Sequence, residues 1–425
     1  MAALRSTVRD LKRSNRERLL RQLYFDAPIS RLDLSQRLGL SPATVTHAVA
    51  EFLQDGLIVE SGVEESEGGR PRTLLRINAD YGYLIGVDVG ETDIQLEIFD
   101  LTLRKLELIR HPVGSSAALP EHVVQQISDG IAELIERAGI KPEQLLGIGV
   151  GMPGIVDVSS GVSVFAPNWG WRQIPFLDLL AAQVSAPIYL DNGAKAMSQA
   201  EQWFGAGQGI EDMAVLLIGT GVGSSIIVDG RLHRGATNSS GEWGHTSIEA
   251  RGRMCRCGSR GCLEAYIGAP GIIQRLREHA PESPLLRHEQ QTAIIADLFH
   301  AAQAGDAAAQ QVLGETIEYL GIGIANLINL LNPQRILLGG WVGMHFDPPL
   351  LARVSEIVAQ YTLMQPFRAA QIGVCQLGQE AVCMGAATLA LDTFLTSAGQ
   401  GLRSGAQATL ARGAAATTRR TAPAA

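Results

Sequence analysis

The segment 241-GEWGHTSIEARGRMCRCGSRGCLE-264 concentrates side chains that bind metal ions. His245 is followed by Cys255, Cys257 and Cys262, and glycines interrupt the cysteine-containing part. One imidazole and three thiolates complete a tetrahedral zinc site, and a site with no open coordination position is structural. Three free buried cysteines are the alternative, but the pattern Cys-x-Cys-Gly-x-x-Gly-Cys is difficult to explain as core packing. The segment therefore predicts a structural zinc ion on a glycine-rich loop.

Apolar runs of strand length alternate with amphipathic helices on both sides of this segment. The first run is Tyr83–Val89, and glycine-rich turns follow two such runs at residues 86–92 and 219–225. Alternation of this kind is typical of α/β architecture. Two similar strand-and-turn units indicate two related halves that face a common cleft, rather than a repeat of short period. We therefore expect one two-lobed α/β domain over residues 79–395.

Residues 1–78 follow a different pattern, helical first and short-stranded afterwards. Helices are expected at residues 16–24 and 31–38, and a short turn then leads to a third helix that begins at Pro42. Ser41 suits the N-cap, and Pro42 suits the first helical position, where its missing N–H is not needed. This order of elements predicts a helix-turn-helix in a separate first domain.

The third helix of this domain has the amphipathic pattern of a recognition helix. Apolar residues recur at i, i+3, i+4 and i+7 and form its buried face: Val45, Ala48, Val49 and Phe52. The opposite face carries small polar groups, which suit base edges and phosphates in the major groove. The predicted DNA contacts at this helix are Ser41, Thr44, Thr46 and His47.

Two short strands, at residues 57–60 and 73–78, are expected to form a wing with Arg70 and Arg72 at or beside its tip. Arginine at such a tip suits a minor groove or phosphates. The alternative is a helical hairpin used for packing or dimerisation. Because the cap, the turn, the amphipathic helix and the basic wing coincide, a winged helix-turn-helix that binds double-stranded DNA is favoured.

Composition and charge agree with this division of the chain. The 425 residues carry a net charge of −8, yet Lys and Arg outnumber Asp and Glu in the first 50 residues, and a local basic end is enough for DNA contact. No long apolar run or signal-peptide pattern occurs, so a cytoplasmic protein without membrane contact is expected. Large apolar residues become rare after Leu391, which predicts a disordered tail over residues 396–425.

The zinc-loop segment resembles the signature of the ROK family (repressors, open reading frames and kinases), which contains Gly-Glu-x-Gly-His followed by such a loop. The resemblance covers nearly all of residues 15–391. It implies a sugar-kinase-type domain with two actin- and ribonuclease-H-like lobes and with phosphate loops at residues 88–92 and 219–223. It also implies a sugar pocket whose hydroxyl-binding side chains are Asn168, Asn192, Glu242, His245 and Glu264.

The sequence departs from the family's kinases at the catalytic position. In ROK sugar kinases an aspartate directly after the pocket asparagine deprotonates the sugar hydroxyl, and Gly193 stands there in this chain. General-base catalysis is worth about 10²- to 10⁴-fold in rate. Glu91 and Asp93 would repel a nucleotide's phosphates, and Trp341 would partly fill its pocket. The alternative is a slow ATP-dependent sugar kinase in which Asp191 replaces the missing base.

The combination of a DNA-binding end and an inactivated kinase-like cleft predicts a sugar-responsive transcriptional regulator, a repressor, of carbohydrate metabolism genes, and not an enzyme. A sugar in the cleft would reorient the winged domains and release the operator DNA. Paired half-sites are the usual solution for helix-turn-helix proteins, so a homodimer or tetramer is expected. A third alternative is a DNA-bound scaffold with an empty cleft that a partner protein regulates.

Overall fold

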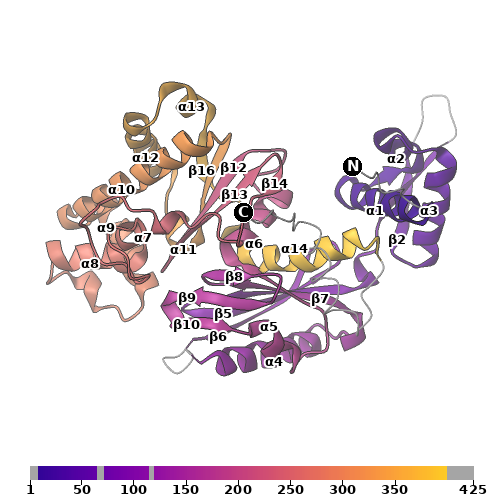
Figure 1. Cartoon of the computed structure of the whole chain (residues 1–425), viewed down its shortest axis with the longest axis horizontal. Helices are drawn as coiled ribbons and strands as arrows, with labels where there is room; N and C mark the ends of the chain where they lie inside the picture. Colours follow the sequence, from indigo (N-terminus) through magenta and orange to yellow (C-terminus); the bar gives the residue numbers. More distant parts are fainter. Residues whose placement is uncertain (1–7, 65–70, 114–118, 400–425) are drawn as a thin grey trace, which may run out of the picture.

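The computed structural model describes residues 8–64, 71–113 and 119–399, apart from the side chains of Val8, Asn168 and Gln379. A small N-terminal domain stands beside two larger lobes (Figure 1). Within these residues no helix combines the length and the apolar character needed to cross a bilayer.

The N-terminal domain has the predicted winged helix-turn-helix arrangement. Its antiparallel sheet has the order β1-β3-β2 and packs with three helices in the described part. The elements are α1 (Val8–Asp26), β1 (Ile29–Ser30), α2 (Arg31–Leu38), α3 (Pro42–Gln54), β2 (Ile58–Glu64) and β3 (Arg72–Ile77). Helix α2 has the predicted bounds, and it ends at Gly39, whose φ of 64° lies in the left-handed region that favours glycine. Helix α1 begins at Val8, earlier than the expected start at residue 16. Its first turns are exposed and carry no apolar repeat, so the sequence pattern gave no sign of them.

The start and the buried face of α3 confirm the local predictions. The Ser41 Oγ accepts a hydrogen bond from the Thr44 backbone N–H at 3.2 Å, as an N-cap does. The buried residues of the helix are Val45, Ala48, Val49 and Phe52. They pack with apolar side chains of α1, α2 and the sheet, so the opposite face of α3 is left to solvent.

The first lobe is built on a mixed sheet with the strand order β11-β7-β4-β5-β6. Its strands and helices are β4 (Tyr83–Val89), β5 (Asp93–Asp100), β6 (Lys105–Pro112), α4 (Pro120–Arg137), β7 (Leu145–Met152), α5 (Phe176–Ala181), β11 (Ile188–Asn192) and α6 (Gly193–Phe204). A smaller sheet, in the order β10-β9-β8, consists of β8 (Ile155–Asp157), β9 (Val162–Ala166) and β10 (Trp171–Ile174).

The second lobe repeats the topology of the first. Its sheet has the order β16-β15-β12-β13-β14, and in both sheets the central strand pairs with antiparallel strands on one side and parallel strands on the other. Its strands are β12 (Met213–Ile218), β13 (Val222–Val228), β14 (Arg231–Leu232), β15 (Arg335–Gly339) and β16 (Gln371–Val374). Its helices are α7 (Glu264–Ile267), α8 (Ala269–His279), α9 (Gln291–Gln303), α10 (Ala307–Leu331), α11 (Gly340–Gly343), α12 (Pro348–Tyr361) and α13 (Met364–Ala369). The prediction of two related α/β halves is therefore confirmed.

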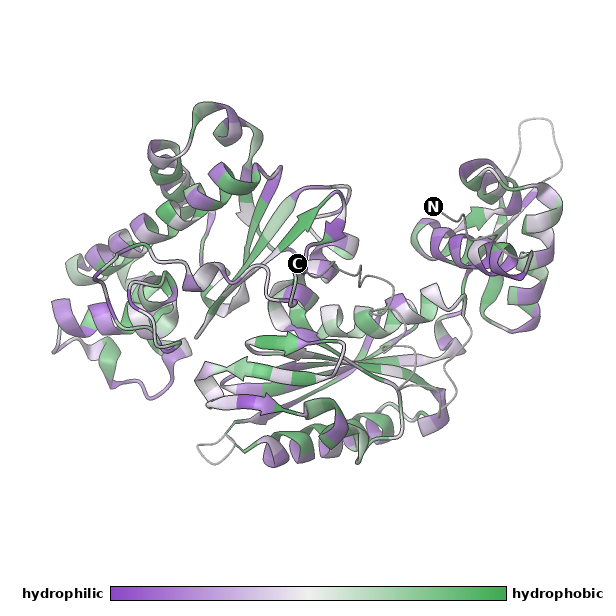
Figure 2. Ribbon diagram, viewed as in Figure 1, coloured by the Kyte–Doolittle hydropathy of each residue, from purple (hydrophilic) through white to green (hydrophobic). Residues whose placement is uncertain are grey.

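The last helix, α14 (Ala381–Thr396), returns from the second lobe to the first. It lies against β4 and β7, as Figure 1 shows in yellow. Figure 2 shows the apolar residues gathered in the central strands and along this helix. The end of α14 joins the core of the N-terminal domain: Leu391, Phe394 and Leu395 belong to the same apolar cluster as residues of α1 and α3, and α14 contacts α1 directly.

The ordered chain continues beyond the point where the sequence loses its large apolar residues. Helix α14 extends past Leu391 to Thr396, and Ala398 is only 2% exposed. A side chain at Gly399 would lie 2.6 Å from Leu57 Cδ2, so this segment packs on the N-terminal domain. Small residues can pack here because the surface of the N-terminal domain supplies the large apolar groups. Residues 400–425 lie outside the described part.

Candidate functional site: a cleft, a metal-ligand cluster and a helix-turn-helix surface

The four predicted metal ligands come together in space. The ligand atoms of His245, Cys255, Cys257 and Cys262 all lie within 4.8 Å of one another. The Cys257 and Cys262 sulfurs are 3.8 Å apart, and the Cys255 sulfur is 3.7 Å from the His245 Nδ1. A tetrahedral ion with Zn–S bonds of about 2.3 Å sets its sulfur ligands about 3.8 Å apart. The donor set and its spacing therefore fit a tetrahedral metal ion such as zinc.

A cavity of about 470 Å³ separates the two lobes next to this cluster. Both glycine-rich turns line it, residues 88–93 from the first lobe and residues 219–224 from the second. Its volume lies within the range of about 300–1,000 Å³ that is usual for small-molecule sites. The predicted sugar-binding residues that line it are Asn192, Glu242, His245 and Glu264.

Carboxylates and an imidazole converge at one end of this cavity. Glu264 is 7% exposed, and its Oε2 accepts a hydrogen bond from the Val222 N–H at 3.0 Å. Burial raises the pKa of Glu242, while the positive charge of Lys195 acts in the opposite direction. His245 lines the same cavity, and its Nδ1 faces the metal-ligand cluster. A carboxylate can accept hydrogen bonds from two sugar hydroxyls, and an imidazole can form a hydrogen bond with one.

Asn192 has a structural task at the cavity wall. Its Oδ1 accepts hydrogen bonds from the backbone N–H groups of Ala194 at 3.0 Å and Lys195 at 3.3 Å, so it caps α6. Its Nδ2 donates to the Gly154 carbonyl oxygen at 2.8 Å. The amide is thereby held rigidly at the start of α6. The side chain of Asn168, the remaining predicted sugar ligand, lies outside the described part.

Gly193, the predicted position of the kinase base, has free space in front of it. Gly193 lines the cavity, and the nearest atom to a Cβ built there would be the Val382 Cγ1 at 3.5 Å. The neighbouring Asp191 is 1% exposed and bonds away from the cavity, with an ion pair of 2.6 Å to the Arg234 guanidinium. Asn238 donates a further hydrogen bond to Asp191 at 3.2 Å. Asp191 therefore does not occupy the catalytic place.

An ion pair crosses the cavity from one lobe to the other, and its arginine, Arg256, also lies 3.7 Å from the Glu264 Oε1 through its Nη2. The Arg256 Nη1 lies 3.1 Å from the Glu91 Oε2, and the Arg256 Nη2 donates to the Thr220 carbonyl oxygen at 2.8 Å. Glu91 belongs to the first turn, and Arg256 lies between two of the metal ligands. This contact therefore ties the zinc-loop segment of the second lobe to the first lobe.

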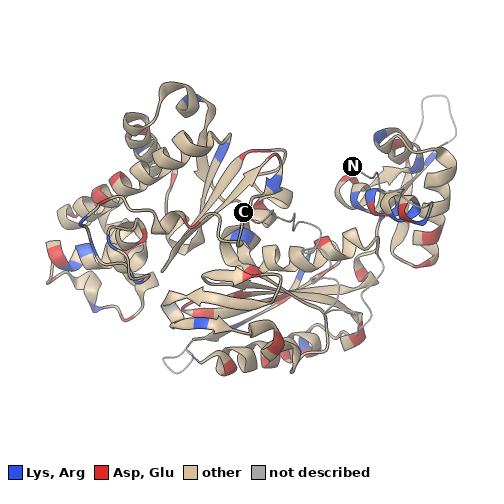
Figure 3. Cartoon of the chain, in the orientation of Figure 1, with Lys and Arg blue, Asp and Glu red and all other residues tan. Residues whose placement is uncertain are grey.

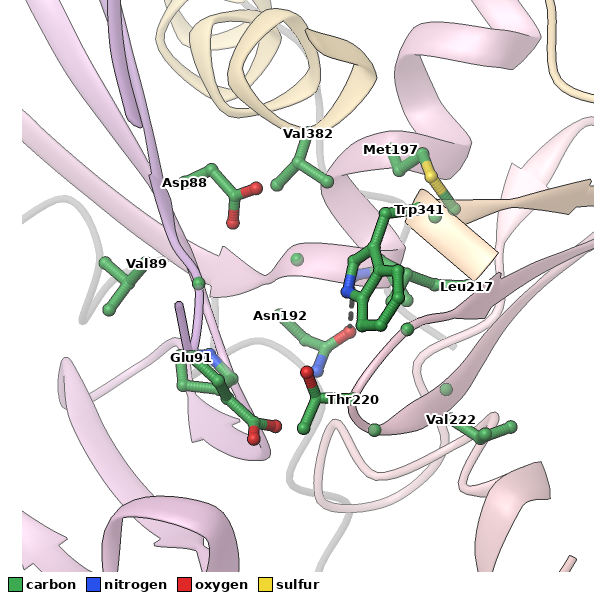
Figure 4. A pocket seen from close by; sticks show the side chains of 18 of the residues that line it. Asp88, Val89, Glu91, Asn192, Met197, Leu217, Thr220, Val222, Trp341 and Val382 are labelled. Atoms are coloured by element: carbon green, nitrogen blue, oxygen red, sulfur yellow. Dashed lines mark hydrogen bonds between the residues drawn. The ribbon is translucent and has the colours of Figure 1, made fainter. Parts of the chain in front are cut away.

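An indole also projects into the cavity. Trp341 lies so close to the second glycine-rich turn that a Cβ at Gly219 would be 2.9 Å from its Nε1. Figure 4 shows Trp341 and Asn192 entering the same cavity from opposite lobes. Behind the first turn, burial and then the negative charge of Asp93 raise the pKa of Asp88 to about 7.

The helix-turn-helix presents part of its predicted DNA-binding set to solvent. Thr46 and His47 are exposed on α3, whereas Thr44 is half-buried and bonds Ser41 through its hydroxyl at 2.8 Å. Arg72 is exposed at the start of β3, and its Nη1 lies 3.5 Å from the Asp33 Oδ1. Arg70, the other predicted wing contact, lies outside the described part.

Two basic residues of α1, Lys12 and Arg16, are paired with acids at the end of α3. Figure 3 shows Lys and Arg distributed along α1. Lys12 binds Glu51 at 2.7 Å, and Arg16 binds both Glu51 and Asp55. The negative charges lower the net positive charge of this face, and the hydrogen bond from Lys12 lowers the pKa of Glu51. The excess of basic residues at the N-terminus is therefore only partly free for phosphates.

Sequence patterns missed the groups that act across long chain distances. The ion pairs Arg256–Glu91 and Arg234–Asp191 join residues that no local spacing connects. Lys195 is likewise only 2% exposed, its Nζ donates to the Asn238 carbonyl oxygen, and burial lowers its pKa. The sequence shows only that these positions carry charged side chains; it does not show which of them pair.

Comparison with known proteins agrees with this geometry. Residues 84–393 match the ROK family, and residues 12–59 match the winged helix-turn-helix DNA-binding family. The chain is 31% identical over 392 residues to the xylose repressor of Caldicellulosiruptor bescii, covering 91% of this chain and 97% of that protein.

Solved structures resemble both the whole chain and its two lobes. A ROK family transcriptional regulator, a homologue of the Escherichia coli Mlc protein, superposes with a TM-score of 0.77 at 25% identity and covers 92% of this chain and 98% of its own. A ROK glucokinase from Streptomyces griseus, in complex with glucose and AMPPNP, superposes with a TM-score of 0.63 at 30% identity and covers 72% of this chain and 99% of its own. The fold, the cleft, the metal-ligand cluster and these matches together establish that the chain belongs to the ROK family.

Proposed function

We propose that the protein is a DNA-binding transcriptional repressor of carbohydrate metabolism genes that responds to a sugar bound in its inactive kinase-like cleft. The observation that carries this proposal is the glycine at position 193, combined with the engagement of Asp191 by Arg234, on a chain that also has an exposed recognition helix. A cleft without a base can still bind a sugar. Its occupancy then serves as a signal rather than as the start of a reaction.

The proposed sugar contacts are Asn168, Asn192, Glu242, His245 and Glu264. Hydroxyl groups need donors and acceptors at fixed positions, and a wrong epimer leaves buried polar groups unpaired at a cost of about 1–3 kcal/mol each. The relatives include a xylose repressor, so D-xylose is the first sugar to test, with D-glucose and N-acetylglucosamine beside it.

The proposed DNA contacts are Ser41, Thr44, Thr46 and His47 on α3, with Arg70 and Arg72 from the wing. A single small domain touches few phosphates, so tight binding calls for two copies on paired half-sites. We therefore infer that a homodimer or tetramer binds the operator in the cytoplasm.

Zinc is the metal that we assign to the His245 and cysteine cluster. With all four positions filled by protein ligands it would be structural, and it would supply no reaction step. Its effect would be to hold the loop that carries Arg256 and to orient the His245 ring toward the cleft. Coordination through Nδ1 leaves the Nε2 proton for a sugar hydroxyl.

The experiment that tests the proposal is operator binding under titration with sugars. DNA from upstream of the protein's own and neighbouring genes is bound at two salt concentrations, and D-xylose, D-glucose and N-acetylglucosamine are added in turn. The regulator proposal expects operator affinity to fall as the salt concentration rises, because phosphate contacts release counterions. It also expects one of the sugars to lower the operator affinity. Binding that no sugar affects would instead support the scaffold alternative.

A sugar kinase is the second candidate, because a glucokinase is among the structural relatives and Asp88 faces the cleft. Incubation with each sugar and ATP distinguishes the two functions. Sugar-dependent release of ADP would establish the kinase, and its absence in protein that binds sugar would leave the regulator.

A further inference from the structure

Helices α6 and α14 both begin at the cleft and both end on the DNA-binding domain. The N-cap and the first residue of α6, Asn192 and Gly193, line the cavity, and so does Val382 in the first turn of α14. At the opposite ends, Trp203 of α6 and Phe394 of α14 pack in the same apolar cluster as α1 and α3. Each helix therefore spans the distance between the two functional surfaces.

The two helices are in direct backbone contact with each other and with the sheet beneath them. A Cβ at Gly385 of α14 would lie 2.0 Å from the Ala196 carbonyl oxygen of α6. A Cβ at Gly149 of β7 would lie 1.7 Å from the Ala386 carbonyl oxygen of α14. With no side chains between them to adjust, such close-packed elements transmit a displacement instead of absorbing it.

Helix α1 of the DNA-binding domain contacts both α6 and α14. The Arg21 Nη1 lies 2.7 Å from the Asp392 Oδ1 of α14, and the Arg21 guanidinium lies over the Trp203 ring of α6 at 5.1 Å. Phe25 meets Trp203 edge to face at 5.2 Å and stacks on Phe204 at 6.1 Å. A shift of α6 or α14 therefore acts on α1 through named contacts.

Arg16 connects α1 onward to the recognition helix. Its Nη1 and Nη2 bind Glu51 and Asp55 at the end of α3, at 2.5 and 2.8 Å. Its Nε donates to the Ala398 carbonyl oxygen, directly after α14, at 3.2 Å. The side chain is only 12% exposed, so one buried guanidinium joins α3 to the chain that leaves α14.

We propose that α6 and α14 form the mechanical connection between sugar and DNA, with Arg21 and Phe25 of α1 as its receiving end. This inference rests on the proposed function. A sugar held at Asn192 and Glu242 acts on the first turn of α6, and the α6–α14 pair carries the change to α1 and, through Arg16, to α3. Coupling of this kind requires only that the sugar binds the two orientations with different affinity, and typical couplings change the affinity about 5- to 150-fold.

The substitution Phe25→Ala tests this connection without reaching either binding surface. Phe25 is 38% exposed and lies outside the buried core of its domain, so the domain keeps its fold. The full-length variant is expected to bind D-xylose and, without sugar, operator DNA as the wild type does. The sugar-induced loss of operator affinity is expected to fall toward one-fold. Leu32→Ala, at 41% exposure in the same domain and without a contact to α6 or α14 among the described interactions, is the matched control and is expected to keep the response.

A second measurement separates loss of coupling from general damage. Because coupling is reciprocal, operator DNA must weaken sugar binding by the same factor by which sugar weakens operator binding. Both factors should fall together in Phe25→Ala and in the ion-pair variant Asp392→Ala, whereas Arg137→Ala, which breaks the exposed Arg137–Glu133 pair on α4, should change neither.

The outcomes of these measurements are distinct. If Phe25→Ala and Asp392→Ala bind both ligands and keep the full wild-type response, the connection through α1 is wrong while the proposed function stands. If none of D-xylose, D-glucose and N-acetylglucosamine changes operator binding by the wild type, the proposed function fails and this inference fails with it.

Discussion

Gly193 supplies no carboxylate to the cleft, although there is enough room for one. The Cβ of a larger residue would meet the Val382 Cγ1 at 3.5 Å and the Met152 carbonyl oxygen at 3.8 Å, which are ordinary contact distances, and the backbone there does not require a glycine. The loss of the base is therefore a chemical change without a steric cause. It leaves the sugar end of the cavity intact.

The substitution Gly193→Asp is expected to fold normally and to keep the sugar response. It is not expected to produce a kinase, because Trp341 and the Arg256–Glu91 ion pair still obstruct the cavity that a nucleotide would have to enter. A base contributes its factor of about 10²–10⁴ only when the phosphoryl donor is bound. ADP release in the presence of each sugar is the measurement, and sugar-dependent ADP from the single variant would show that the nucleotide end is open.

The raised pKa values of two acids, Asp88 and Glu97, predict that the stability of the first lobe depends on pH. Burial, with the neighbouring negative charge of Asp93 for Asp88 and of Glu380 for Glu97, raises both pKa values to about 7. Unfolded, these groups titrate near pH 4. The folded chain therefore binds more protons between about pH 4 and pH 7, and this contribution makes the protein less stable as the pH rises through that window.

The Glu97→Gln variant tests this contribution. Glu97 is 1% exposed and faces Gln95, Lys105, Arg110 and Glu380. The amide keeps an acceptor for the Gln95 side chain but cannot ionise. Thermal unfolding from pH 5 to pH 8 should thus show a smaller loss of Tm with rising pH than in the wild type. An unchanged slope would mean that Glu97 titrates at its ordinary pKa.

At the scale of an element, α3 depends on the cap at its start. The Ser41 hydroxyl accepts from the Thr44 N–H and also contacts the Thr44 hydroxyl, so it orders the first turn of the helix that we propose to enter the major groove. Pro42 supplies the fixed φ of the first helical position. Stability and the proposed DNA contact thus meet at one residue.

Ser41→Ala is expected to lower the free energy of unfolding by about 1 kcal/mol, the usual cost of a lost N-cap. Ser41→Asn restores an acceptor and should recover most of this loss. Urea unfolding of the three proteins gives the stability, and operator binding gives the affinity. If Ser41→Asn restores stability but not DNA affinity, the serine hydroxyl itself contacts the DNA. If Ser41→Ala is as stable as the wild type, the N-cap does not stabilise the domain.

The whole molecule places the metal-ligand cluster and the DNA-binding surface far apart in the fold, on different lobes and domains (Figure 1). The core of the N-terminal domain includes α14 and strands of the first lobe but no residue of the zinc-loop segment. Metal and DNA therefore have separate structural supports. The ion pair of Arg256 with Glu91 links the cluster to the first lobe across the cleft.

Removal of the metal is consequently expected to abolish the sugar response and to spare operator binding. Cys262→Ser takes away one thiolate, and His245→Ala takes away both a metal ligand and a proposed sugar contact. Metal content by elemental analysis and operator affinity with and without sugar are the measurements. A His245→Ala protein that retains its zinc and its sugar response would refute the proposed role of this residue. Loss of sugar-free operator binding in Cys262→Ser would instead show that operator binding depends on the metal cluster.

The sequence by itself determined the features that arise from neighbours along the chain. The spacing of His245 and the three cysteines, the cap and buried face of α3, and the alternation of strands and helices follow from local hydrogen bonds, side-chain periodicity and ligand chemistry. The glycine at 193 could be read directly against the family's pattern. The winged helix-turn-helix and the two-lobed α/β fold were therefore predictable.

Only the tertiary structure decided which distant groups meet. The burial of Asp191 against Arg234, the reach of Arg256 to Glu91 across the cleft, and the joint contact of α6 and α14 with Arg21 and Phe25 depend on how whole elements pack. The extension of α14 to Thr396 has the same cause, since its last turn is held by apolar groups of the N-terminal domain. Periodicity and spacing describe one element at a time, whereas these contacts are set by close packing between elements that the chain brings together from far apart.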